Sequence, residues 1–115
     1  MTQERFGVEH LANESRYVLL DREADGGAKE IGEEVYVDVI DGGVTERVFH
    51  HTGVAEEYGG QGLAAVLVRS AVEQAVSDGH KIVPVCPYVV TWFKKNPEFG
   101  EHEVKARPEH LRAIR

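Results

Sequence analysis

Cysteine is nearly missing from this sequence, and long hydrophobic runs are missing altogether. The single cysteine, Cys86, cannot form an internal disulfide, which fits a reducing compartment such as the cytosol. No stretch reaches the roughly 18 apolar residues that a membrane-spanning helix needs, so no membrane association is expected. Because the first residues also lack the apolar core of a signal peptide, we predict a cytoplasmic protein.

Basic residues are scarce as well. The chain has 13 Lys and Arg against 20 Asp and Glu, which gives a formal net charge of −7. This balance argues against a nucleic-acid-binding function, because binding phosphates needs a cationic surface. Of the 115 residues, 42% are hydrophobic and 29% are charged, as in soluble globular proteins. We therefore predict a single domain over residues 1–115 with a core of its own.

Two Asp-Gly-Gly turns divide the first half of the chain into strands. The turn at 25–27 separates a β-prone run at 15–21 from a run at 31–39 in which apolar and polar residues alternate. The turn at 41–43 is a strong hairpin signal and leads into a third strand at 44–54. Three strands in succession predict an antiparallel meander.

The pattern changes to helical spacing in the second half. Apolar residues recur at three- and four-residue intervals over 63–76, which predicts an amphipathic helix that ends near Gly79. A short buried strand at 81–85 and a second helix at 89–95 follow, and the tail at 108–115 can form one or two helical turns. The predicted order of the main elements is β-β-β-α-β-α.

A glycine-rich loop joins the third strand to the long helix. Gly59, Gly60 and Gly62 precede the first helical amides, which have no partners within the helix and carry partial positive charge. Such a loop can bind a phosphate or pyrophosphate, although a tight turn that merely reverses the chain is an equal alternative on the residues alone. It is neither a P-loop, since no Lys-Ser/Thr follows Gly62, nor a dinucleotide fingerprint, since Ala65 replaces the third glycine.

The segment from Val54 to Ala64, VAEEYGGQGLA, resembles the acetyl-coenzyme A signature of the GNAT N-acetyltransferases, Gln/Arg-x-x-Gly-x-Gly/Ala. Gly59 stands at the Gln/Arg position of that signature. The flanking motifs are similar to those of a small single-domain branch of the family, often called YjdJ-like. These motifs are Phe49-x-His51-Thr52-x-Val54, Val-Pro-Val-Cys-Pro-Tyr-Val at 83–89 and Asn-Pro-Glu-Phe at 96–99, and the resemblance covers residues 15–100.

The resemblance implies a compact α/β (α+β) GNAT fold with a mostly antiparallel, splayed sheet and two main helices. It also implies that acetyl-coenzyme A is the cofactor, with the main chain of Val54 bonded to its pantetheine arm. Lys94 and Lys95 either contact coenzyme A phosphates or form a solvated helix end. No metal ligand is expected. By the resemblance, the pyrophosphate is cradled by Gly59, Gly60, Gln61, Gly62, Leu63 and Ala64.

Cys86 and His51 are the candidate catalytic residues. Cys86 ends the short strand close to the expected acetyl group. It could line the pocket during direct transfer, which we favour, or accept the acetyl group as a thiolate; a small buried apolar role is the alternative. His51 could deprotonate the incoming ammonium, unless it is only a surface histidine. We prefer it to His50, which should face the other side of the strand.

Many GNAT enzymes use a tyrosine to protonate the departing thiolate, and Phe93 stands at that position here. Tyr88 or water would have to replace it. We expect an acetyl-coenzyme A-dependent N-acetyltransferase that modifies a primary amine, on a protein lysine or a small polyamine, in an open acceptor cleft. A monomer or weak dimer is expected. The alternatives are a non-catalytic acyl-coenzyme A-binding module, which Phe93 and Gly59 favour, and an interaction domain that has kept only the fold.

Overall fold

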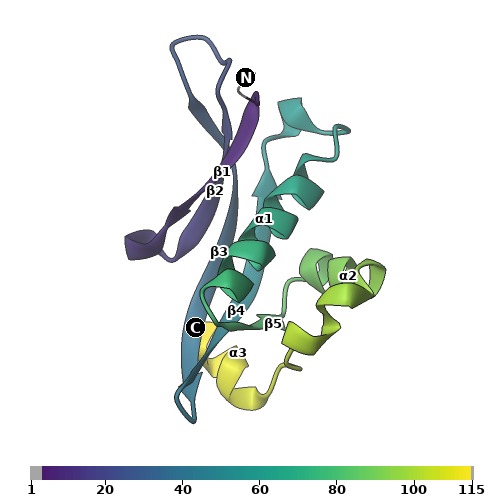
Figure 1. The fold of residues 1–115 in the computed structure, drawn as a ribbon. Helices are drawn as coiled ribbons and strands as arrows, with labels where there is room; N and C mark the ends of the chain where they lie inside the picture. The colour runs from purple at the N-terminus through teal and green to yellow at the C-terminus, as the bar shows by residue number, and fades with distance from the viewer. Residues whose placement is uncertain (1–3, 115) are drawn as a thin grey trace.

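The computed structural model describes residues 4–114 and contains one five-stranded sheet (Figure 1). The strands lie in the order β1-β2-β3-β4-β5. The pairs β1–β2, β2–β3 and β3–β4 are antiparallel, whereas β5 runs parallel to β4. The predicted mostly antiparallel sheet is therefore confirmed. The strands are β1 (Phe6–Leu11), β2 (Arg16–Asp21), β3 (Lys29–Asp41), β4 (Val44–Val54) and β5 (Lys81–Pro84).

Two main helices, α1 (Leu63–Ser77) and α2 (Pro87–Lys95), accompany the sheet, as predicted. Figure 1 shows α1 lying along the sheet with α2 beside it, and α3 (Pro108–Ile114) near the β3–β4 hairpin. Short 3-10 turns occupy 12–14, 56–58 and 97–102. Among the described residues, no helix has the length and apolarity needed to cross a lipid bilayer.

The predicted meander corresponds to β2, β3 and β4. In the hairpin between β3 and β4, Asp41 pairs with Val44, and the two turn residues are Gly42 (φ 59°) and Gly43 (φ 82°). Both positions need the left-handed backbone conformation that glycine adopts without steric cost. The strand β1 was not predicted, because its six residues include only two strongly apolar side chains besides Leu11. The segment is a strand because it pairs with β2 in the folded protein.

The hydrophobic core lies between α1 and one face of the sheet, which we call the helix face. Tyr17, Leu19, Tyr36 and Phe49 supply the sheet side of this core. The alternation predicted over 31–39 is correct only in part: Ile31 is buried as expected, but Tyr36, expected on the polar side, is buried beneath α1 as well. The helix contributes one stripe of small and aliphatic residues, Leu63, Leu67, Val68, Ala71, Val72 and Ala75.

The opposite face of the sheet, which we call the open face, is covered by α3 at the hairpin end. His110 of α3 is fully buried; its Nδ1 accepts a bond from the Arg107 amide (2.8 Å), and its Nε2 donates to Glu46 Oε1 (2.7 Å). Arg107 also donates to that oxygen (2.7 Å). Burial alone would raise the pKa of Glu46, but the bonds from His110 and Arg107 bring it below its usual value.

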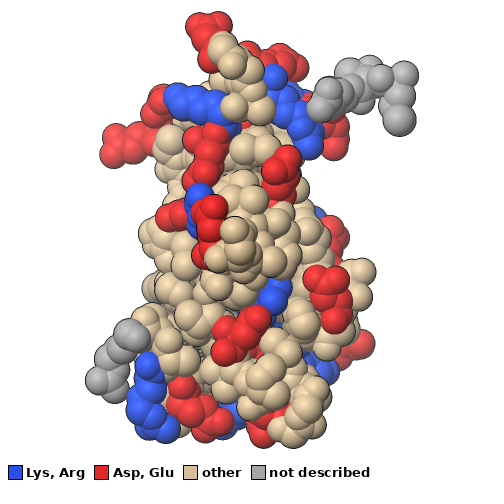
Figure 2. All heavy atoms as spheres, turned by 90° about the vertical axis from the view of Figure 1, so that its left-hand side faces the viewer, with Lys and Arg blue, Asp and Glu red and all other residues tan. Residues whose placement is uncertain are grey.

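Charged side chains of both signs are interspersed over the side of the molecule shown in Figure 2. Ion pairs join some of the charges of the molecule: the Arg16 guanidinium lies within salt-bridge distance of Glu14, Glu30 and Glu33. Such ion pairs neutralise some of the carboxylates locally, while the formal net charge stays at −7.

Candidate functional site

The strands β4 and β5 part from each other halfway along β4. Their paired residues end at Phe49 and Pro84, and the amides of Val85 and Cys86 both donate to the Phe49 carbonyl (3.0 Å each). The chain then turns into α2, whereas β4 continues to Val54 without a partner in β5. The result is the splayed opening that was predicted, with the main chain of β4 along one side and Cys86 at its inner end.

A β-bulge at His50 shapes this part of β4. His51 pairs with Val35 and Phe49 pairs with Tyr36, so His50 is the extra residue. Because of this insertion, Thr52 rather than His51 shares the helix face with Phe49, and His51, paired with Val35, lies on the opposite face. The His51 side chain is 55% exposed, and its Nε2 lies 3.6 Å from a carboxylate oxygen of Glu33.

The glycine-rich loop ends at the first turn of α1. Gly60 (φ 78°) and Gly62 (φ 72°) have left-handed backbones, and the first backbone bond of the helix runs from the Val66 amide to the Gly62 carbonyl (3.3 Å). No side chain among residues 4–114 caps this helix. A Cβ built on Gly60 or Gly62 would meet nothing within 4 Å. Free amides beside open space suit an anion.

A buried carboxylate anchors the start of this loop to β2. The Tyr58 hydroxyl donates to Asp21 Oδ2 (2.6 Å), and Arg5 binds both oxygens of Asp21 (2.9 and 3.0 Å). The bonds from Arg5 and then Tyr58 hold the pKa of Asp21 well below its usual range. No sequence motif indicates this anchor, because Asp21 and Tyr58 are far apart in the chain.

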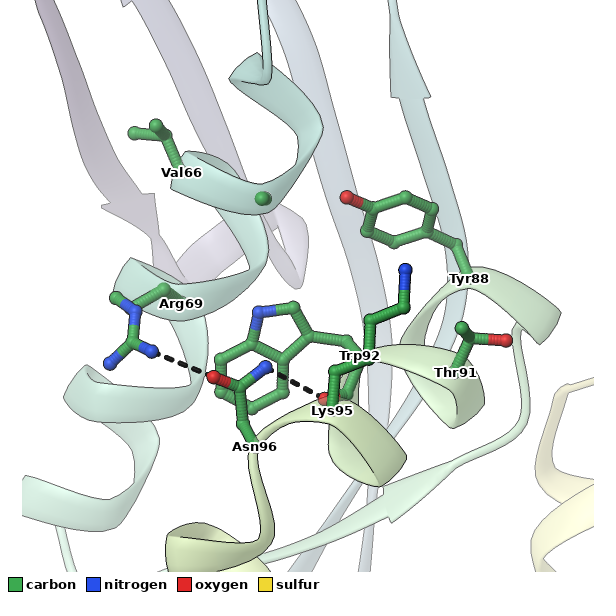
Figure 3. A pocket seen from close by; sticks show the side chains of 8 residues that line it. Val66, Arg69, Tyr88, Thr91, Trp92, Lys95 and Asn96 are labelled. Atoms are coloured by element: carbon green, nitrogen blue, oxygen red, sulfur yellow. Dashed lines mark hydrogen bonds between the residues drawn. The ribbon is translucent and has the colours of Figure 1, made fainter.

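A groove of about 340 Å³ runs between α1 and α2 (Figure 3). It begins at the first turns of both helices, where Ala65 and Tyr88 lie, and it continues to Asn96. Arg69 of α1 donates to the Asn96 side chain (2.8 Å), which in turn donates to the Trp92 carbonyl (2.8 Å) and so ties the helices together. The residues that line the groove are Ala65, Val66, Arg69, Tyr88, Thr91, Trp92, Lys95 and Asn96.

The two candidate lysines lie differently with respect to this groove. Lys95 lines it and extends along it in Figure 3, whereas Lys94, also exposed, is not among the lining residues. Lys94 and Lys95 follow each other on one short helix, so they form a matched pair for experiment.

Cys86 belongs to a chain of polar groups on the helix face that the sequence did not reveal. Its thiol lies 3.4 Å from Thr52 Oγ1, and Thr52 Oγ1 lies 2.5 Å from Glu34 Oε1. Glu34 is fully buried, and its other oxygen, Oε2, has no hydrogen-bond partner within residues 4–114. Burial raises the pKa of Glu34 to about 9, even though the hydrogen bond from Thr52 acts in the opposite direction.

The structure thus brings some of the predicted residues together and separates others. Val54 lies on the open edge of β4, next to the loop of Gly59, Gly60, Gln61, Gly62, Leu63 and Ala64. Cys86 contacts Thr52 on the helix face, whereas His51, the neighbour of Thr52, lies by Glu33 instead. Within residues 4–114, no cluster of His, Cys, Asp and Glu has the geometry of a metal site.

Comparison with known proteins identifies relatives of this fold. Residues 16–102 match the family described as GCN5-related N-acetyl-transferase. A GCN5-like protein from Staphylococcus aureus has a similar structure, with a TM-score of 0.61, 22% identity, and 94% of this chain and 97% of that chain covered. For ribosomal-protein-alanine N-acetyltransferase from Brucella melitensis, the TM-score is 0.52 at 20% identity, and the match covers 84% of this chain and 67% of that chain.

The NatC complex bound to Gag peptide and CoA is a third similar structure. Its TM-score is 0.50 at 22% identity, and the match covers 58% of this chain and 43% of that one. No curated protein sequence matches the chain.

Proposed function

Because this chain belongs to the GCN5-related N-acetyltransferase family, we propose that it transfers the acetyl group of acetyl-coenzyme A to a primary amine. The observation that carries the proposal is the opening between β4 and β5, which has the glycine-rich loop at its outer end and Cys86 at its inner end. A protein lysine or a small polyamine is the proposed acceptor. Residues 22–28, where the family resemblance places helices that help form the acceptor site, contain no helix, and this supports an open acceptor cleft.

The cofactor fits along three consecutive features of the molecule. The amides of Gly59 to Ala64 bind the pyrophosphate at the start of α1. The pantetheine arm follows the unpaired edge of β4, where the main chain of Val54 bonds to it, and the thioester reaches Cys86. The NatC complex, which holds CoA and Gag peptide, supports this use of the fold.

In the proposed reaction the amine attacks the thioester directly, and Cys86 lines the acetyl pocket. His51 removes a proton from the incoming ammonium, since its exposed ring lies beside Glu33, where a cation can approach. The attack forms a C–N bond, the nitrogen then loses its second proton to solvent, and the C–S bond breaks, which releases coenzyme A as a thiolate that needs a proton.

A non-catalytic acyl-coenzyme A-binding module is the second candidate. Phe93 favours it, because this residue is packed in the core at 4% exposure and has no proton to give where many relatives have a tyrosine. A module of this kind would bind acetyl-coenzyme A without turnover.

Mass spectrometry separates these functions. Protein is incubated with isotopically labelled acetyl-coenzyme A and either a library of lysine peptides or a set of polyamines. We expect the label on amine nitrogen together with release of coenzyme A. Binding by calorimetry without transfer to any amine would favour the module, and absence of binding would favour an interaction domain that has kept only the fold.

The lysine pair gives a prediction about the cofactor groove. We propose that Lys95 rather than Lys94 contacts a phosphate of coenzyme A, because only Lys95 lines the groove that begins at the first turns of α1 and α2. Lys95→Glu places a negative charge there and should weaken coenzyme A binding about tenfold. Lys94→Glu makes the same charge change one residue away and should leave the affinity nearly unchanged. Calorimetric titrations at low and high salt measure both variants, and equal losses for the two would remove Lys95 from the site.

A further inference from the structure

The chain of Cys86, Thr52 and Glu34 is built for moving a proton. The three groups come from the β5–α2 connection, β4 and β3, and they are joined by contacts of 3.4 Å and 2.5 Å. Glu34 pairs with Tyr17 on one side and with Thr52 on the other, so its side chain lies on the helix face, with no exposed surface. Burying a carboxyl group whose only hydrogen-bond partner is one hydroxyl costs free energy of folding, so Glu34 does not stabilise the fold.

The surroundings keep Glu34 protonated at neutral pH. Desolvation is the main cause of its raised pKa, about 9, and the nearby Cys86 and Glu33 act in the same direction. Tyr17 directs its hydroxyl away, toward Arg47 (2.8 Å). A carboxyl in this state cannot take up another proton, but it can give one. Its pKa is also close to that of an ordinary thiol, about 8.5, which suits transfer to a thiolate.

We propose that Glu34, acting through Thr52 and Cys86, supplies the proton that the departing coenzyme A thiolate needs. The inference rests on the proposed function and adds to it a residue that the sequence did not indicate. Glu34 is a positioning residue in this scheme, because only the Cys86 thiol at the end of the chain meets the reacting sulfur. When Glu34 is protonated, all three groups can both donate and accept, so the chain can run from the carboxyl to the thiol.

The protons balance as follows. The Cys86 thiol gives its proton to the coenzyme A thiolate, the Thr52 hydroxyl gives its proton to the Cys86 sulfur, and the Glu34 carboxyl gives its proton to the Thr52 oxygen. Coenzyme A leaves as a thiol, Cys86 and Thr52 are restored, and Glu34 remains as a carboxylate. Solvent returns a proton to Glu34. The acceptor nitrogen loses two protons, one as the ammonium before the attack and one as the amide forms, so one of them offsets the proton that coenzyme A gains and the other is released to solvent.

Glu34→Gln tests the inference, because it keeps the shape and polarity of the side chain but removes its proton chemistry. At neutral pH we expect kcat/KM for acetyl-coenzyme A to fall about 100-fold, with the affinity for coenzyme A unchanged. In the wild type, kcat/KM should decline as pH rises through about 9, since the protonated carboxyl is the active form. That decline should be absent in Glu34→Gln.

Two variants of Thr52 test the middle of the chain. Thr52→Val should cause a loss like that of Glu34→Gln, because it removes the hydroxyl at nearly constant volume. Thr52→Ser should restore most of the activity. Wild-type turnover in Glu34→Gln and Thr52→Val, or a reduced rate that still declines near pH 9 in Glu34→Gln, would overturn the inference.

Alkylation of the single cysteine gives a readout that does not depend on acetyl transfer. Glu34 is ionised only above about pH 9, and a carboxylate there disfavours a thiolate at Cys86. Iodoacetamide should therefore alkylate Glu34→Gln faster than the wild type above that pH, whereas the two rates should be similar at neutral pH. Equal rates above that pH would overturn the coupling between the two groups. Wild-type protein that acetylates no amine would instead count against the proposed function, while faster alkylation of Glu34→Gln would still establish the chain.

Discussion

Gly62→Val is expected to reduce the affinity for coenzyme A about 100-fold while the protein stays folded. Gly62 is exposed, and its Cβ would point into the open space beside the first amides of α1, where we place the pyrophosphate. A branched side chain there keeps the phosphates away from those amides, and each lost hydrogen bond to a charged group costs about 1.5–3 kcal/mol. Calorimetric titration with coenzyme A measures the effect.

Gly79→Val is the matched control for this substitution. Gly79 (φ 84°) follows the other end of α1, has the same left-handed backbone conformation, and also has open space where a Cβ would be. Both variants therefore carry a similar strain of about 1–2 kcal/mol, but only Gly62→Val changes the proposed pyrophosphate site. Equal affinities in two folded variants would show that the loop does not bind the cofactor.

Cys86→Phe is expected to reduce acetyl transfer by at least about 100-fold, whereas Cys86→Ser should stay within about tenfold of the wild type. In direct transfer this side chain lines the acetyl pocket, so its size matters more than its nucleophilicity. Phenylalanine at the inner end of the β4–β5 opening would displace the thioester. Serine fills the same space and can still donate a proton. Steady-state rates with a good acceptor, together with thermal unfolding of each variant, measure the difference.

The intact mass of the protein distinguishes this mechanism from a covalent one. After brief incubation with acetyl-coenzyme A, we expect no acetyl group on Cys86. A hydroxylamine-sensitive adduct that goes on to acetylate an amine, combined with inactive Cys86→Ser, would establish Cys86 as a nucleophile instead.

The parts of the site that are local in sequence could be predicted from it. The glycine-rich loop, the strand before it and the helix after it are contiguous, so spacing alone fixed their arrangement, and α1 begins at Leu63 as expected. The position of Cys86 at the end of a short strand was also evident from a contiguous motif.

Features that depend on strand register could not be predicted. The sequence predicts Glu34 on the polar side of its strand, although the alternation around it fits either face. Only the pairing of Tyr17, Glu34 and Thr52 across β2, β3 and β4 puts that carboxyl beneath the helix layer. The bulge at His50 is a similar case, since one extra residue changes which neighbours share a face and no motif marks it.

Real-time ¹³C NMR with carbonyl-labelled acetyl-coenzyme A tests the central claim most directly. The protein is mixed with the labelled cofactor and the best amine acceptor, and the carbonyl signal is followed. We predict that the thioester signal is replaced by an amide signal at a rate proportional to protein concentration, and that the Gly62→Val variant greatly slows this change at low cofactor concentration. A thioester signal that persists in the presence of bound wild-type protein and every acceptor tested would contradict the account.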